Sequence, residues 1–204
     1  MKPNLSCCVA KGRPREFNVD EALTAALRVF WRRGYEGASM AELTAEMGIA
    51  KPSLYAAFGN KEELFKKALD LYEREKMAYM GEALKETTSR KMAERLLTGA
   101  LAMQTSSCDP KGCLGVISMV ACGQEASQIR DSVIERQKSS RQALIARLEE
   151  FKSEGDLPPD IEPEALARYM VAVLQGLSVQ AGAGASVSEL KSLVDMAMRT
   201  WPGR

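Results

Sequence analysis

The sequence predicts an all-α protein, and two patterns carry this prediction. Apolar residues recur at intervals of three and four along most of the 204 residues, which is the spacing of one face of a helix. Alternating runs rich in Val and Ile, which would indicate strands, are missing. The first sixty residues hold short segments ended by glycine, whereas longer segments follow, so we expect a domain boundary near Asn60.

The composition excludes several classes of function. The chain is 46% hydrophobic and 27% charged, with a net charge of +1. It contains no histidine, which excludes Ser-His-Asp and Cys-His catalysis and mixed Cys/His zinc sites. We also find no phosphate-binding glycine loop and no usefully spaced pair of carboxylates. We therefore expect a protein that is not an enzyme and that holds no cofactor and no metal.

The sequence also favours a cytoplasmic location. Five cysteines, an odd number, argue against a disulfide framework and suit a reducing compartment. The first fifteen residues lack the apolar run of a signal peptide. The charge-free stretch 169–188 is interrupted by polar residues and glycines, so we expect no contact with a membrane.

Three helix starts are marked in the first 63 residues. Each pairs a capping residue with a glutamate three positions later, as in a capping box: Asn18 and Glu21, Ser39 and Glu42, Asn60 and Glu63. The first helix is expected over residues 19–33, with Gly34 ending it in the left-handed conformation.

The segment between the second and third starts has the pattern of a helix-turn-helix. Leu43 and Met47 give one short helix an inward face, and Gly48 breaks it. A second short helix is expected over residues 51–58. Pro52 lies in its first turn, where the missing amide proton costs no hydrogen bond.

DNA binding is the function that this second short helix suggests. Lys51, Ser53 and Tyr55 face away from the predicted core and suit contacts with phosphates and base edges. Residues 1–33 carry seven basic groups against three acidic ones, a local charge of +4. The alternative is a short helical hairpin that only caps a core.

Several motifs between Gly12 and about Arg74 occur together as they do in one known family. They are GRPRE, a Phe-x-x-x-Gly-Tyr run, the helix start at Ser39, a Leu-Tyr-x-x-Phe run and a following Lys-Glu-Glu-Leu. With these motifs the stretch resembles the N-terminal DNA-binding domain of TetR-family transcriptional repressors. The resemblance covers under a third of the chain.

The resemblance implies an all-α homodimer with an N-terminal three-helix helix-turn-helix DNA-binding domain and a C-terminal helical bundle for effector binding and dimerisation. The implied division is a flexible basic arm over residues 1–15, the helix-turn-helix domain over 16–60 and the effector and dimerisation domain over 61–204. The DNA contacts that it implies are Arg13, Arg15, Ser39, Lys51, Pro52, Ser53, Tyr55 and Lys61. Ala50 departs from the family pattern, since it removes a hydroxyl cap of about 1 kcal/mol.

The resemblance further implies a cavity for a small effector within the C-terminal helices. Methionines suit an adaptable apolar pocket, although filling a core is the alternative. The expected lining is Met77, Met80, Met103, Cys113, Met119 and Cys122. Because residues 112–124 carry no charge, an uncharged or largely apolar effector is favoured.

In this family the last two helices form the dimer interface. The residues with the required apolar spacing are Tyr169, Val173, Leu177, Leu190 and Val194. The same spacing would serve an intrachain core equally well.

The overall prediction is therefore a repressor that binds a palindromic double-stranded DNA operator as a dimer and is released by an effector. An alternative keeps the DNA-binding domain and places an oxidant or electrophile switch at Cys108 and Cys113. Cys113 should lie near a helix N-terminus, and Lys111 is close in sequence, so both would favour a thiolate. The competing interpretation is that these cysteines are small buried hydrophobic residues.

Overall fold

The computed structural model describes residues 17–120 and 126–204, and no strand occurs within these two ranges. The prediction of an all-α protein is therefore confirmed. The helices follow in the order α1 (Val19–Gly37), α2 (Met40–Met47), α3 (Lys51–Phe58), α4 (Lys61–Lys76), α5 (Ala78–Ala83), α6 (Ser89–Thr105), α7 (Leu114–Val120), α8 (Ser127–Ser153), α9 (Pro163–Gly182) and α10 (Val187–Arg199).

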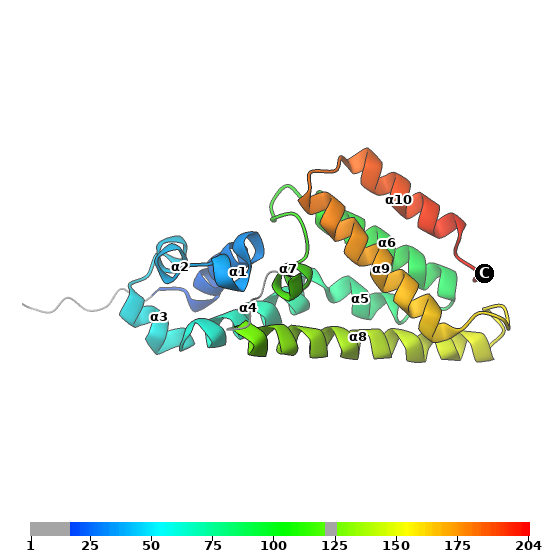
Figure 1. Cartoon of the computed structure of the whole chain (residues 1–204), viewed down its shortest axis with the longest axis horizontal. Helices are drawn as coiled ribbons and strands as arrows, with labels where there is room; N and C mark the ends of the chain where they lie inside the picture. Colours follow the sequence, from blue (N-terminus) through cyan, green and yellow to red (C-terminus); the bar gives the residue numbers. More distant parts are fainter. Residues whose placement is uncertain (1–16, 121–125) are drawn as a thin grey trace, which may run out of the picture.

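The helices α1 to α3 and the helices α6, α9 and α10 lie at opposite ends of the molecule. Figure 1 shows α1, α2 and α3 gathered at one end, and α6, α9 and α10 side by side at the other. The helix α4 leads from the first group into the body, and α8 runs along the body as its longest described helix. The short helix α7 packs against both α1 and α8, so it lies where the two groups meet.

Aromatic side chains join α1 to α4. The ring of Phe30 meets that of Phe65 edge-on with 5.1 Å between centroids, and Trp31 meets Tyr72 in the same way at 4.8 Å. Edge-to-face pairs of this kind add about 0.5–1.5 kcal/mol each beyond their buried area. The core of α1 to α3 thus continues into α4 without a break at residue 60, and the exact domain boundary stays a prediction.

Local signals in the sequence set most helix ends. The capping box at the start of α4 is complete, with Asn60 and Glu63 each accepting the other's backbone N–H at 2.9 Å. Gly34 has a φ of +70° and kinks α1 where its end was predicted, after which one more helical turn runs to Gly37. A second complete capping box, Ser186 with Glu189, begins α10 and was not predicted.

The helical stretch that begins after Asn60 is divided in two. The helix α4 ends at Lys76, and α5 begins at Ala78. Met77 between them has left the helical conformation, with φ −103° and ψ 6°. No helix within the described ranges has the length and apolar character needed to cross a membrane.

Candidate nucleic-acid interface and ligand cavity

The turn between α2 and α3 has the geometry that the sequence predicted. Gly48 adopts the left-handed conformation, with φ 65° and ψ 25°, which favours glycine. Its N–H donates to the carbonyl oxygen of Ala45 at 3.2 Å, and the N–H of Ile49 donates to that of Thr44 at 3.1 Å. These bonds close α2 and fix the direction in which the chain enters α3.

The helix α3 is anchored on one side and open on the other. Leu54 is fully buried and Phe58 nearly so, which fixes the helix against the core. On the open side Lys51, Pro52 and Tyr55 are exposed, while Ser53 is partly buried. The Lys51 ammonium lies 5.9 Å from the centroid of the Tyr55 ring, close to the limit of a cation–π contact. The polar side of α3 therefore faces outward, as a DNA-binding helix requires.

The start of α3 differs from the starts of α2 and α4. Ser39 caps α2 by accepting the N–H of Glu42 at 3.0 Å. Ala50 offers α3 no side-chain cap, so the first amides of α3 have no partner from that residue. Amides at a helix N-terminus bind anions well, and a DNA phosphate would fit this position.

Other basic residues near α3 already have partners within the chain. Lys61 lies over the Tyr35 ring at 4.7 Å and donates to the carbonyl oxygen of Glu36 at 3.5 Å. Burial lowers the pKa of Lys61, with Glu36 opposing the shift. Arg32 pairs with Glu46 at 3.3 Å, joining α1 to α2. The predicted arm residues Arg13 and Arg15 lie outside the described residues.

A cavity of about 380 Å³ lies within the C-terminal helices, lined by residues of α4 to α9. Of the predicted lining, Met77, Met80, Met103 and Cys113 are there. The prediction was wrong for Met119, which packs against the core shared by α1 and α4 and not in the cavity. Cys122 lies outside the described residues.

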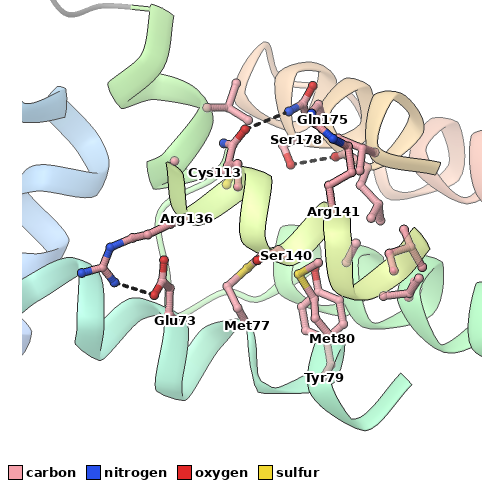
Figure 2. A pocket seen from close by; sticks show the side chains of 18 of the residues that line it. Glu73, Met77, Tyr79, Met80, Cys113, Arg136, Ser140, Arg141, Gln175 and Ser178 are labelled. Atoms are coloured by element: carbon pink, nitrogen blue, oxygen red, sulfur yellow. Dashed lines mark hydrogen bonds and ion pairs between the residues drawn. The ribbon is translucent and has the colours of Figure 1, made fainter. Parts of the chain in front are cut away.

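The sequence argument missed the charged part of the lining. Glu73 comes from α4, and Arg136 and Arg141 come from α8 (Figure 2). The charge-free segment 112–124 therefore forms only part of the wall. The expectation of an uncharged or largely apolar effector, which rested on that segment alone, stays a prediction. No sequence signal marked these residues, because α8 carries charges along most of its length.

Two tyrosines approach the thiol of Cys113 within this cavity. The Tyr72 hydroxyl donates to Cys113 Sγ at 3.4 Å and lies 3.8 Å from Met103 Sδ. Burial, followed by the neighbouring Cys113, raises the pKa of Tyr72 well above its usual value. The same causes raise the pKa of Tyr79. Both hydroxyls therefore stay protonated near neutral pH and can act as donors.

The other predicted sensor, Cys108, lies in a different setting. It is exposed in the loop between α6 and α7, whereas Cys113 is partly buried at the start of α7. Lys111, expected to act on Cys113, donates instead to the carbonyl oxygen of Ser106. An ion pair of 2.7 Å between Lys76 and Asp109 ties the loop to the end of α4.

A buried polar network ties the same loop to α1. Trp31 Nε1 donates to the carbonyl oxygen of Gly112 at 3.0 Å. Gln104 donates to that oxygen at 3.1 Å and accepts the N–H of Gly112 at 2.8 Å. The amide of Gln104 also reaches Ser178 on α9 at 3.4 Å. The loop is therefore held between the DNA-binding end and the body of the molecule.

The predicted dimer-interface residues fall into two groups. Leu177, Leu190 and Val194 are 0–4% exposed and belong to the core of α6, α9 and α10. Their side chains have almost no surface left to contact a second subunit, so these three residues form part of the intrachain core, which was the alternative interpretation. Tyr169 is exposed, and Val173 is partly buried. The apolar side chains left open on α9 and α10 were not predicted: Val179, Val187 and Met196.

A helix-turn-helix with an outward polar edge, carried by an all-α body with an apolar cavity, defines a DNA-binding transcriptional regulator. The chain belongs to the tetR family of bacterial regulatory proteins. The model of that family matches residues 22–68, and a model of tetracycline repressor-like C-terminal domains matches residues 93–197. Members of this family are regulators and not enzymes.

Relatives match along nearly the whole chain. The transcriptional repressor ComR of Escherichia coli K12 is 32% identical, covering 96% of this chain and 95% of ComR. The repressor BdcR of the same strain is 28% identical, covering 91% and 90%. Among solved structures, a cysteine variant of the regulator CifR bound to 26-bp operator DNA superimposes with a TM-score of 0.87. It is 40% identical, covering 93% of this chain and all of that one.

Proposed function

We propose that this protein is a cytoplasmic repressor that binds a palindromic operator as a homodimer and leaves it when an effector fills the cavity. The observation that carries the proposal is the outward polar edge of α3, formed by Lys51, Ser53 and Tyr55 on a buried Leu54–Phe58 anchor. The solved structure of CifR in complex with operator DNA supports an operator-binding role for this chain.

Release of the operator would follow from a shift in population between two arrangements of the dimer. A helix-turn-helix dimer reads two half-sites about 34 Å apart, so a small change in the separation of the two α3 helices abolishes the match. An effector that binds one arrangement better than the other moves the population toward it.

The helix α7 offers a physical route for this coupling. Gly115 and Val116 line the cavity, and Ile117 packs against the kink of α1. A methyl group at Gly34 would lie 3.3 Å from Ile117 Cγ2, which shows how close the two helices are. An effector that displaces α7 would therefore push directly on α1.

Selection of duplexes from a random library by the full-length protein tests the proposal. A palindromic sequence should be enriched, and its affinity should fall steeply with salt because phosphate contacts release counterions. Tyr55→Ala should weaken binding to the selected duplex, whereas Lys138→Ala, an exposed substitution on α8, should not. Absence of any enriched sequence would contradict the proposal.

A second candidate trigger is oxidation or alkylation of Cys113. It is favoured by the hydrogen bond from Tyr72, which holds the thiol at the cavity wall. If Cys113 is the trigger, N-ethylmaleimide should release the selected duplex from the wild type and from Cys108→Ser. It should not release the duplex from Cys113→Ser. If release persists in the double variant, the thiol switch is excluded, and the operator-binding proposal is unaffected.

A further inference from the structure

One charge in the cavity has no counterion among the residues that the structure describes. Three charged side chains line it, and Glu73 pairs with Arg136 at 2.7 Å. Arg136 also pairs with Asp70, at 2.6 Å. The third charge, Arg141, is partly buried, and its guanidinium has no hydrogen bond or ion pair with any residue in ranges 17–120 and 126–204.

The two arginines point in different directions. Figure 2 shows Arg136 reaching back to Glu73 on α4, whereas Arg141 extends from α8 toward α9. The surrounding wall is mostly apolar and includes Leu84, Leu96 and Leu144. Arg141 is only partly buried, so its guanidinium is open to a ligand, and a carboxylate would give it a charge-assisted partner that no described residue supplies.

We propose that the effector is an amphiphilic carboxylate, whose acid group binds Arg141 while its apolar body fills the cavity. This inference rests on the proposed function of the cavity as the effector site. A guanidinium presents two parallel N–H donors that match both oxygens of a carboxylate. Apolar cations are disfavoured, because Arg141 would repel them.

The size of the cavity limits the carboxylate. At roughly 30 Å³ for each non-hydrogen atom, the 380 Å³ cavity holds about a dozen such atoms. An eight-carbon straight-chain acid is of this size. Octanoate is therefore a suitable probe, and octanamide is its matched control, since it keeps the length and shape but has no charge.

Calorimetric titration of the full-length protein with both probes tests the inference. The wild type should bind octanoate roughly 10- to 100-fold more tightly than octanamide, the usual range for a charge-assisted hydrogen bond. Arg141→Met should remove this preference and leave octanamide binding intact, which also shows that the cavity is still formed. Arg141→Lys should keep part of the preference. Lys138→Met removes a charge from the exposed side of the same helix and should have no effect.

Three outcomes overturn the inference: equal binding of the two probes by the wild type, binding of neither probe, or an octanoate preference that survives Arg141→Met. If Arg141→Met loses both probes, the comparison of octanoate with octanamide in the wild type decides. Binding of the selected duplex is measured in parallel, so a failure of the carboxylate is distinguished from a failure of the proposed function.

Discussion

The carbonyl oxygen of Gly112 receives two buried hydrogen bonds, from side chains on two different helices. Trp31 donates from α1, and Gln104 donates from α6. Gln104 also accepts the Gly112 N–H, so both backbone groups of this glycine are satisfied by one side chain. Buried backbone groups must be paired, and here the pairing also joins the DNA-binding end to the cavity.

Replacing Gln104 by an apolar residue of similar size should therefore lower the free energy of unfolding. Gln104→Leu leaves the buried N–H of Gly112 without an acceptor, which typically costs about 1–3 kcal/mol. Urea denaturation of the variant should show a loss in this range. Gln142→Leu, on the exposed side of α8, is the control and should change stability by less than about 0.5 kcal/mol. An equal loss in the two variants would contradict the role assigned to Gln104.

Lys51 is the basic residue on the open side of α3. If each subunit places it on a phosphate, Lys51→Ala should weaken binding of the selected duplex. It should also reduce the salt slope by about 1.8 per dimer, or about 0.9 for each lost contact. The measurement is affinity over a series of salt concentrations. If binding weakens but the salt slope is unchanged, Lys51 does not contact a phosphate of the DNA backbone.

At the scale of elements, α1 and α7 meet at a glycine that serves two purposes. Gly34 has a φ of +70°, a conformation that residues with a Cβ adopt only at a cost. It is also buried against Ile117, so a larger residue would separate the helices. The kink in α1 and its contact with α7 thus depend on the same position.

Gly34→Ala should destabilise the protein by about 1–3 kcal/mol, since it strains the backbone and crowds Ile117. Gly176→Ala is the matched control, because a Cβ there meets nothing within 4 Å and the residue lies inside α9. The control should gain up to about 1 kcal/mol of helix stability. Thermal melts of the two variants should therefore shift in opposite directions. A shift in the same direction would show that Gly34 is not constrained as described.

At the scale of the whole molecule, α9 and α10 leave apolar side chains open to solvent. Val179, Val187 and Met196 are each 57–60% exposed. They lie on the helices that the family resemblance assigns to the dimer interface, and burial by a second copy would remove them from water.

Met196→Glu should therefore shift the protein toward monomer, because a carboxylate buried at an interface without a partner is strongly unfavourable. Sedimentation measures the change, and affinity for the selected duplex should fall with it. Ile134→Glu, on α8, replaces another exposed apolar residue, 45% exposed against 60% for Met196, outside the proposed interface, so it is the control. If only the control dissociates the dimer, the interface lies on α8.

The sequence by itself determined the features that depend on a few neighbouring residues. The caps at Ser39 and Asn60 act over three positions, and the breaks at Gly34 and Gly48 depend on one backbone angle. The helix-turn-helix could be predicted in full for the same reason. The outward edge of α3 followed from it, since Leu54 and Phe58 define the inward side.

The tertiary structure decided which faces meet and which charges pair. Helical spacing marks an apolar stripe but not what covers it, so Leu177 and Leu190 could not be told apart from true interface residues. Pairing of Arg136 with Glu73 spans 63 positions, and the Trp31–Gly112 bond spans 81. Such contacts form only when helices distant in the sequence pack together. The same packing leaves Arg141 without a counterion in ranges 17–120 and 126–204.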